Sequence, residues 1–300
     1  MPIAPRKVRR VHVGVLYISL DYYVNGHAGR QPRAYETFCR VHVGGTLDIR
    51  EIKNSMKKNL AAALLLASCS VRGQAPARYT IYHAEAPISV DARVDEPAWR
   101  HAPLLSDFHF NWWTSGEKER TEARILWDDK NLYVSYVCHD KHISASVTQR
   151  HGPVSNDDCV EIFISPNPDK VTNYYTFEIN AIGTMLNRCK TSWWTGPPTW
   201  NPEGVRWRTS LDGMHVKRES ASDSEWTVEL AIPFENFSHD AAHVPPQDGD
   251  VWRLNLYRTG GITNKQDSSW SPMPPGNQSF HRPESFGTVQ FSTQTPGRQP

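Results

Sequence analysis

Carboxyl groups gather on one central stretch of this 300-residue chain, and their spacing limits what they can do. Glu161 follows the pair Asp157–Asp158 in the run NDDCVEIFI, and Glu178 lies in the next alternating run, YYTFEIN. Two carboxyls can serve as acid and base in glycoside hydrolysis. Asp157 and Asp158 suit that role poorly, because neighbouring residues of a strand point to opposite faces. No Ser-His-Asp or zinc-hydrolase signature is present either, so we do not expect an enzyme.

The same acidic residues offer oxygen ligands to a metal ion. Asp157 and Asp158 are the candidates, because Ca²⁺ prefers carboxylate and carbonyl oxygens. The chain has no EF-hand spacing, and aspartates in hairpin proteins mostly form turns. We therefore assign no cofactor and keep a structural calcium ion as an alternative. Zinc is not expected, because the five cysteines form no C-x-x-C pair and no Cys/His cluster.

Aromatic residues are abundant and include eleven tryptophans. A sugar site combines polar groups, which bond hydroxyls, with an aromatic ring that stacks on the apolar face of the sugar. Strand alternation places five polar candidates off the apolar faces: Glu161, Glu178, Asn180, Asn255 and Tyr257. Six tryptophans lie in expected loops: Trp112, Trp113, Trp193, Trp194, Trp200 and Trp270. The alternative interpretation is a solvated sheet face, with most tryptophans in the core.

Short strands must position these residues. Apolar and polar residues alternate with a period of two in the stretches 122–127, 132–138, 159–164, 174–181, 226–232, 252–257 and 286–291. Asp128–Asn131 is a turn that joins the first two as a hairpin, and Asp212-Gly213 predicts a second hairpin within 205–219. About ten strands over residues 79–292, without a helix of useful length, predict an all-β fold. We expect a single antiparallel, jelly-roll-like β-sandwich.

The segment 56–69 resembles the signal peptide of a bacterial lipoprotein. Charged residues at Met56-Lys57-Lys58 precede the apolar run Leu60–Ala67, and Leu66-Ala67-Ser68-Cys69 resembles a lipobox. This predicts acylation of Cys69, export, and a lipid anchor at the outer membrane or the periplasmic face of the cell envelope. An ordinary secretory signal is the alternative. Because a signal must be N-terminal, we interpret residues 1–55 as a non-native upstream extension, 70–78 as a tether and 293–300 as a flexible tail.

Charge and cysteine content limit the partners further. The net charge is +1 and the sequence pI about 7.7, so no attraction to nucleic acid is expected. Beyond Cys39 and Cys69, three cysteines remain, which permits one disulfide or buried thiols. Haem binding is a further alternative, because related sandwiches ligate haem through Met and His. Only Met185, Met214 and Met273 follow the signal, and no C-x-x-C-H motif is present.

Seven segments in order resemble the family 9 carbohydrate-binding modules, which are known from xylanases. They are VDARVDEPAW, ARILWDDKNLYVSYVCHD, NDDCVEIFI, YYTFEINAIGT, EWTVELAIPF, WRLNLYR and SFHRPESFG, and together they span residues 88–291. The resemblance implies a non-catalytic β-sandwich that clamps a sugar ring between two tryptophans, with structural calcium in some members. Here the positions of the clamp tryptophans correspond to Ser155 and Phe280. Glu161 is kept, whereas an arginine is replaced by Glu178 and a glutamine by Tyr257.

The resemblance therefore implies a retained scaffold with an altered clamp. The expected carbohydrate site consists of Phe280, Glu161, Glu178, Asn255 and Tyr257, with the loop tryptophans Trp193, Trp194 and Trp270 nearby. The expected ligand is an oligo- or polysaccharide. We expect an exported glycan-binding lipoprotein that serves polysaccharide catabolism together with glycoside hydrolases or uptake proteins. The alternatives are a sandwich that has lost its sugar site and docks other proteins, a haem-binding sandwich and a glycoside hydrolase.

Overall fold

A computed structural model describes residues 75–211, 224–274 and 276–294, and the strand backbone at 16–22, 35–41 and 216–217. The chain divides into two compact units, residues 1–72 and 73–300. In the first unit, β1 (Leu16–Tyr22) pairs antiparallel with β2 (Tyr35–Val41). The signal segment, Cys69 and most of the tether lie outside the described residues. The predictions made for them stay predictions.

The regular secondary structure of the second unit consists almost entirely of strands. They are β3 (Arg78–His83), β4 (Thr121–Trp127), β5 (Asn131–His139), β6 (Ser144–Ala145), β7 (Cys159–Ser165), β8 (Tyr174–Asn180), β9 (Met185–Lys190), β10 (Arg206–Thr209), β11 (Val216–Lys217), β12 (Glu225–Pro233), β13 (Val251–Thr259), β14 (Asp267–Ser269) and β15 (Gly287–Ser292). The helical segments are short: α2 (Pro97–His101) and the 3₁₀ turns η1 (Val154–Asn156), η2 (Pro168–Lys170), η3 (Phe234–Phe237) and η4 (Pro283–Ser285).

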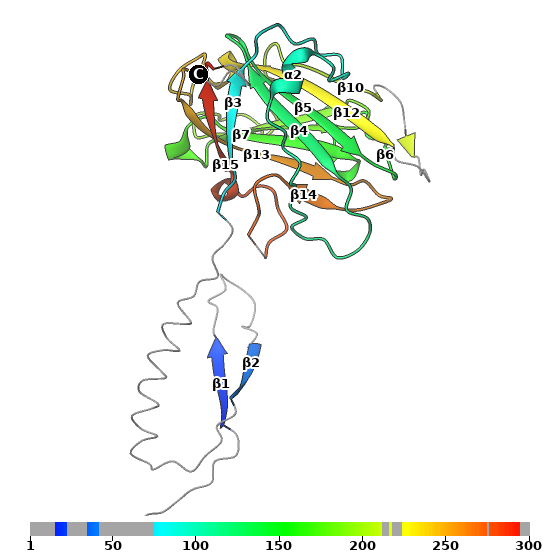
Figure 1. Ribbon diagram of the computed structural model, residues 1–300, viewed down its shortest axis with the longest axis vertical. Coiled ribbons are helices and arrows are strands. Elements are labelled where there is room, and N and C mark those ends of the chain that lie inside the picture. Colours follow the sequence, from blue (N-terminus) through cyan, green and yellow to red (C-terminus); the bar gives the residue numbers. More distant parts are fainter. Residues whose placement is uncertain are drawn as a thin grey trace, which may run out of the picture. The chain divides into compact units, whose positions relative to one another are not determined.

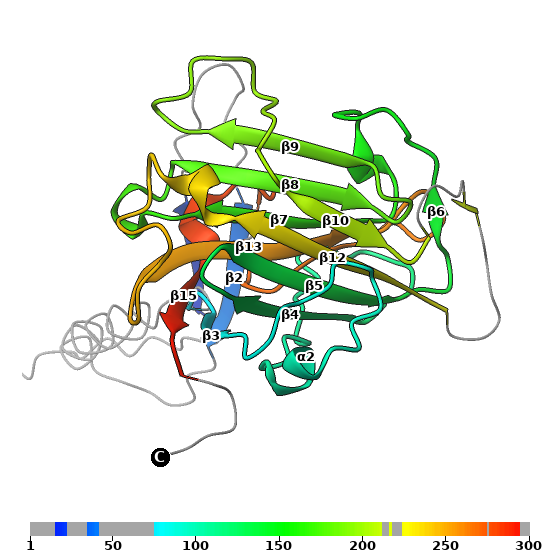
Figure 2. The same ribbon diagram turned by 90° about the horizontal axis from the view of Figure 1, so that it is seen from above.

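One long sheet curls on itself to make two layers. Its strand order is β10-β12-β5-β4-β3-β15-β13-β7-β8-β9, with β14 added beside β13. Strands β10 to β3 form one layer and β15 to β9 the other, as Figures 1 and 2 show. Most neighbours are antiparallel, but β3 pairs parallel with both β15 and β4. The predicted all-β sandwich is confirmed, and the two parallel pairings of β3 are a departure from a purely antiparallel sheet.

The space between the layers is a continuous apolar core. Val134 and Trp226 come from one layer, Ile162 and Leu254 from the other, and none is more than 1% exposed. The Tyr136 hydroxyl donates across the core to the Glu161 carbonyl oxygen at 2.8 Å. These are the residues that alternation assigned to the inner faces, since a period of two puts every second side chain on the same side. Cys138, Val160, Ile162, Ile164, Trp226, Leu230, Trp252 and Leu254 lie in the alternating stretches, and all are buried.

The outer face of the second layer is covered rather than solvated. The loop between β14 and β15 folds over it and buries a second aromatic cluster. The cluster consists of Phe163, Tyr174, Tyr257, Met273, Phe280 and Phe286. The polar residues of this face are consequently buried as well, which corrects the alternative of an open solvated face. A recess formed between a sheet and an overlying loop is a common place for a ligand.

Strands β10 and β11 and the three cysteines differ in how they agree with the sequence. The prediction of a second hairpin within 205–219 is wrong, because β10 pairs with β12 and β11 pairs with β6. Cys138, Cys159 and Cys189 are buried free thiols.

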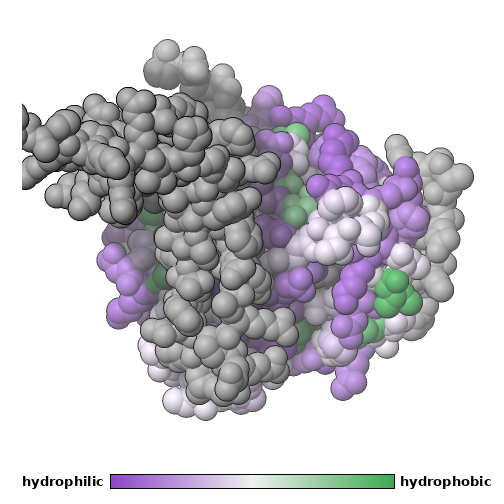
Figure 3. Space-filling model, turned by 90° about the horizontal axis from the view of Figure 1, so that it is seen from below, coloured by the Kyte–Doolittle hydropathy of each residue, from purple (hydrophilic) through white to green (hydrophobic). Residues whose placement is uncertain are grey.

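Within the described residues, no helix is both long and apolar enough to cross a membrane. The described surface visible in Figure 3 is mostly hydrophilic with small apolar spots, and Ile262, at 76% exposed, is the most exposed large hydrophobic residue described.

Candidate functional site

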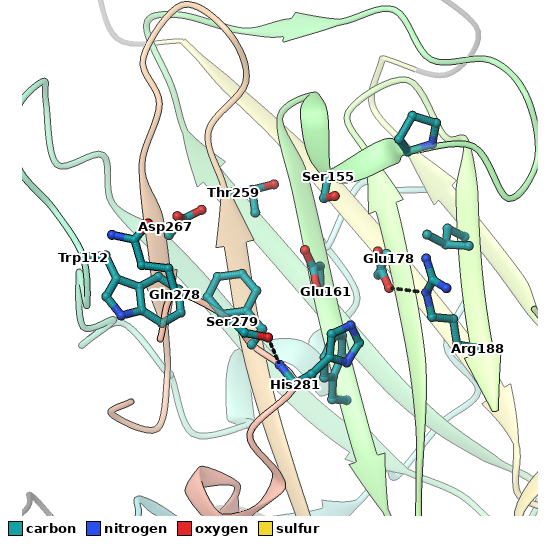
Figure 4. A pocket seen from close by; sticks show the side chains of 14 residues that line it. Trp112, Ser155, Glu161, Glu178, Arg188, Thr259, Asp267, Gln278, Ser279 and His281 are labelled. Atoms are coloured by element: carbon teal, nitrogen blue, oxygen red, sulfur yellow. Dashed lines mark hydrogen bonds and ion pairs between the residues drawn. The ribbon is translucent and has the colours of Figure 1, made fainter. Parts of the chain in front are cut away.

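A cleft of about 330 Å³ lies on the outer face of the second layer. Strands β7, β8, β9, β13 and β14 supply its floor, and the loop before β15 and the turn η1 supply its walls. The lining residues are Trp112, Pro153, Ser155, Glu161, Phe163, Glu178, Leu186, Arg188, Thr259, Asp267, Gln278, Ser279, Phe280 and His281. Figure 4 shows their side chains around the recess. The cleft therefore combines aromatic rings with carboxyl, guanidinium, amide and hydroxyl groups.

Strand register builds the floor. Tyr257 on β13, Glu161 on β7 and Glu178 on β8 are direct cross-strand neighbours in one row. The Glu178 carboxylate accepts a hydrogen bond from the Thr176 hydroxyl at 3.2 Å, and its Oε1 lies 3.8 Å from Arg188 Nε. Glu161 is only 4% exposed, and its carboxylate has no hydrogen bond or ion pair with another described residue. Its oxygens face the cleft (Figure 4).

The carboxyl groups of the floor are difficult to ionise. Burial, together with the charges of Glu178 and Asp267, raises the pKa of Glu161 well above its ordinary value. Burial also raises the pKa of Glu178 to about 7, although Arg188, Thr176 and Lys190 act against the shift. Burial likewise raises the pKa of Asp267. Near neutral pH the floor therefore holds carboxyls that can act as donors or acceptors toward a ligand.

Three stacked rings form the aromatic wall. Phe280 lies 4.2 Å from Tyr257 with an interplanar angle of 17°, and 5.4 Å from Trp112 with an angle of 29° (centroid distances). Phe280 is only 9% exposed, so these two neighbours leave little of its surface for a sugar. Trp112 is half-buried and lines the cleft. Trp112 is consequently the ring with the most surface available for stacking in this wall.

Two buried donors belong to residues that line the recess. Trp112 Nε1 and Arg188 Nε are buried and have no hydrogen-bond partner among the described residues. Donors of this kind are costly unless something bonds them, and sugar hydroxyls are suitable acceptors. His281 Nδ1 lies 3.0 Å from the Tyr174 hydroxyl. Burial and the charges of Lys190 and Arg188 lower the pKa of His281 to about 4, so its ring is neutral near pH 7.

The structure brings together part of the site predicted from the sequence. Glu161, Glu178 and Phe280 line the cleft. Tyr257 is fully buried beneath Phe280, and the Asn255 amide donates to the Ser271 carbonyl at 3.0 Å. Neither residue lines the cleft, because the loop after β14 packs on top of them.

The predicted loop tryptophans lie elsewhere. Trp193 stacks on His239 with centroids 4.1 Å apart and donates from Nε1 to Asp240 at 2.8 Å. Trp194 donates from Nε1 to the Pro197 carbonyl, within its own loop. Trp270 is 6% exposed and packs edge-on against Tyr79 in the core. None of the three lines the cleft, so their interactions are those of residues that hold loops and core together.

The two candidate calcium ligands are already occupied by protein donors. Asp157 accepts from the backbone N–H of Ser146 and Val147 and from the Asn180 amide, at 2.8–3.1 Å. Asp158 accepts from the backbone N–H of Ser144 at 2.6 Å and of Gly261 at 3.0 Å. Both carboxylates therefore tie loops to the end of β7. N–H groups occupy the positions that a hard cation would need.

Sequence reasoning missed two of the charged lining residues. Arg188 and Asp267 come from β9 and β14, and neither belongs to a recognisable motif. Leu186 and Arg188 lie on the same face of β9, because every second side chain of a strand points the same way. This spacing is the only local feature of the sequence that indicates a position of Arg188 beside the cleft. Arg188 brings a guanidinium from the next strand beside Glu178, the position at which the family resemblance implies an arginine.

Comparison with known proteins now identifies the class. The family model for carbohydrate-binding family 9 matches residues 104–291, which is more than half of the chain. The chain belongs to carbohydrate-binding family 9, a family of non-catalytic binding modules. Endo-1,4-beta-xylanase A of Thermoanaerobacterium saccharolyticum is 25% identical over 210 residues. The match covers 69% of this chain but only 16% of the xylanase, so the chain spans a small part of that relative.

Solved structures agree on the fold. A candidate carbohydrate-binding protein from Bacteroides uniformis superposes with a TM-score of 0.62 at 24% identity, covering 73% of this chain and 100% of that one. A family 9 module from Caldicellulosiruptor kristjanssonii in complex with cellotriose gives a TM-score of 0.52 at 13% identity. That comparison covers 74% of this chain and 98% of the module. A structure of a family 9 module from that organism in complex with glucose gives a TM-score of 0.50 at 13% identity.

Proposed function

We propose that the domain binds a saccharide in the cleft beside Glu161 and that it acts without catalysis. One observation carries the proposal: the half-buried Trp112 and buried, unpaired polar groups converge on a single recess in a member of a carbohydrate-binding family. Stacking on Trp112 would hold the apolar face of a sugar, and the floor would read its hydroxyls. The Caldicellulosiruptor module in complex with cellotriose supports this ligand class.

The placement of the carboxyls supports binding rather than hydrolysis. The two carboxyls of a glycoside hydrolase flank the scissile bond, one acting as acid and the other as base or nucleophile. Glu161 and Glu178 instead lie next to each other on the cleft floor, on neighbouring strands. A ligand lying on that floor would meet both from the same side. Haem ligation also has little support, since Met185 is fully buried in the core and Met273 packs in the outer cluster.

We infer the cellular role from the resemblance of Leu66-Ala67-Ser68-Cys69 to a lipobox. Export and acylation would place the module on the cell envelope, at the outer membrane or the periplasmic face, where it would hold glycan fragments for glycoside hydrolases or uptake proteins. The likeness to a segment of a xylanase supports a link with polysaccharide breakdown. If this proposal is right, the protein partitions into detergent, and Cys69→Ala releases it. Intact mass spectrometry that finds residues 1–55 still attached would contradict the proposed processing.

Isothermal titration calorimetry against cellulose- and xylan-derived oligosaccharides tests the sugar-binding step. The protein, its Trp112→Ala and Phe280→Ala variants, and Trp194→Ala as a matched tryptophan control should be compared. We expect saccharide binding that Trp112→Ala weakens and Trp194→Ala leaves unchanged, because Trp194 does not line the cleft. No heat with any saccharide would favour the alternative role, protein–protein docking by a sandwich that has lost its clamp at Ser155.

A further inference from the structure

The cleft floor carries more carboxyl groups than cationic groups, and a cation from a ligand would favour their ionised form. Glu161, Glu178 and Asp267 line the floor with carboxyls. Arg188 is the one cationic side chain among the lining residues, because the His281 ring is neutral near pH 7. Arg188 Nε is 3.8 Å from Glu178 Oε1 and forms its ion pair there, although its charge also acts on Glu161. Neither Glu161 nor Asp267 has an ion pair within the described part of the chain. A ligand entering the cleft therefore meets two carboxyls without a cation between them.

Glu161 is the strongest indication that a ligand completes this group. It is 96% buried, lacks a hydrogen-bond partner among the described residues, and faces the recess (Figure 4). Buried carboxyls are costly unless they are paired or bonded, and native structures rarely leave them so. The neighbouring charges of Glu178 and Asp267 make its ionisation harder still. A cationic donor from a ligand would relieve both the lost hydration and the repulsion.

The spacing of the three carboxyls argues against a metal ion. Within the described residues, Glu117, Glu119 and His142 form the one group of three ligating side chains whose atoms all lie within 4.8 Å of one another. The floor carboxyls are thus spread too widely for all three to hold one ion. The compact group is itself occupied, because Glu119 accepts from the Asn264 and Gln266 amides at 2.9 and 2.6 Å. A cation carried on a larger ring fits the floor better.

We propose that the cleft selects an amino sugar, a sugar ring that bears a protonated amine, and that Glu161 and Asp267 receive the ammonium group. This inference rests on the proposed function. An ammonium has three donors and no acceptor, so it can bond two separate carboxylates at once. Charge-assisted bonds of this kind are stronger than bonds from a neutral hydroxyl. Trp112 would stack on the ring that carries the amine.

Three ligands with the same β-1,4-linked skeleton isolate the amine. The glucosamine disaccharide carries ammonium groups, its N-acetylated form carries neutral amides, and cellobiose carries hydroxyls. Calorimetry on the full-length protein near neutral pH should give at least about tenfold tighter binding of the glucosamine disaccharide than of either neutral sugar. A tenfold ratio corresponds to about 1.4 kcal/mol. Added salt should reduce that ratio, because the preference is electrostatic.

Matched variants identify the groups responsible. Glu161→Gln and Asp267→Asn each keep the shape and remove a charge, so each should reduce the ratio to about threefold or less while cellobiose binding persists. Asp129→Asn, whose side chain is 90% exposed beside His83, controls for net charge and should leave the ratio unchanged. Thermal melting confirms that each variant is folded, and Asp267→Asn decides the matter if Glu161→Gln does not fold.

Each outcome has one meaning. Equal affinity for the amine and the neutral sugars, or an unchanged ratio in both charge variants, overturns the amino-sugar inference and leaves the proposed sugar binding intact. Absence of binding to all three ligands contradicts the proposed function and the inference together. Weaker binding of all three sugars in Glu161→Gln, with the ratio kept, would show that Glu161 bonds hydroxyls and not an ammonium group, which also overturns the inference.

Discussion

Glu161 and Glu178 are direct cross-strand neighbours on β7 and β8, and they are only 4% and 5% exposed. Like charges placed opposite each other in a sheet are destabilising, and burial adds to the cost. Arg188 offsets the charge of Glu178, but no ion pair with another described residue serves Glu161. Both residues line the floor of the cleft, so this cost is placed at the surface that a ligand would contact.

The first prediction is that the carboxyls of the cleft floor lower the stability as the pH rises from mildly acidic values through neutrality. The folded-state pKa of Glu178 is raised from 4.5 to about 7, and that of Glu161 is raised further. A carboxyl with a raised folded pKa contributes stability that is fully present below its unfolded pKa, and this stability is lost as the pH rises through the folded pKa. Glu178 therefore loses its contribution between its ordinary value of 4.5 and about pH 7, and Glu161 loses its contribution up to higher pH. We expect the melting temperature to fall across this range as the pH rises.

Two variants test whether Glu161 and Glu178 cause the change of melting temperature with pH. Glu161→Gln and Glu178→Gln should each flatten the fall in melting temperature, whereas Asp158, whose pKa is also raised to about 7, still titrates in both variants. His281 has a pKa lowered to about 4, so its imidazole changes stability in the opposite direction, but only below about pH 6.5. Wild-type and variant curves with the same slope would contradict the assignment of the effect to these two glutamates.

The second prediction concerns the core. Ile162 is 1% exposed between the layers, and Ile162→Ala should lower the free energy of unfolding by about 2–5 kcal/mol through lost transfer energy and a cavity. Ile262 is 76% exposed, so Ile262→Ala is a chemically identical control that should change it by less than about 0.5 kcal/mol. Urea unfolding of both variants measures the difference. Similar losses in the two would show that Ile162 is not part of a packed core.

Local patterns were enough to predict most of the strands. Alternation at Ile162, Trp226 and Leu254 identified β7, β12 and β13, because a period of two depends only on neighbours along the chain. The hairpin expected at Asp212-Gly213 failed for the opposite reason. Turn residues at this position favoured a local pairing, but β10 found its partner in β12, which lies farther along the chain. Strand pairing is a long-range property that turn chemistry cannot settle.

The site was only partly predictable for a similar reason. Alternation placed Glu161 and Glu178 on one face, but their register and the arrival of Arg188 from β9 depend on how the strands pair. Whether an outward residue is exposed depends on what covers it. Tyr257 lies under Phe280, and only folding of the loop after β14 decides this. Trp112 and Trp194 look alike in the sequence, yet only Trp112 reaches the cleft.

The third prediction distinguishes stacking from hydrogen bonding at Trp112. Trp112→Ala should weaken sugar binding by about 1–3 kcal/mol, the value for burying an aromatic side chain. This corresponds to about one to two orders of magnitude in affinity. Trp112→Phe keeps a ring but removes Nε1, a buried donor without a partner. It should cause a smaller loss, about 1 kcal/mol for one hydrogen bond. Calorimetry with one saccharide measures both, and equal affinities in wild type and Trp112→Ala would rule out stacking there.

The last prediction concerns the open side of the cleft at Ser155. The resemblance to family 9 modules implies a clamp tryptophan at this position. Ser155 is exposed on η1 and lines the cleft together with Trp112 (Figure 4). Ser155→Trp would supply a second ring at that position without displacing a buried neighbour. A second stacking surface should therefore tighten binding of a neutral oligosaccharide by about tenfold, equal to about 1.4 kcal/mol.

Two controls make the Ser155→Trp result specific. Ser155→Ala removes the hydroxyl without adding a ring and should leave the affinity within about twofold, a fraction of one hydrogen bond. The double variant Ser155→Trp with Trp112→Ala separates independent rings from a true clamp. If the two rings hold one sugar between them, the gain from Ser155→Trp should shrink when Trp112 is absent, because a contact shared by two residues is not additive. An unchanged gain would mean that the new ring binds the ligand at a separate place, and a loss of affinity in Ser155→Trp alone would mean that the ligand occupies the space beside Ser155.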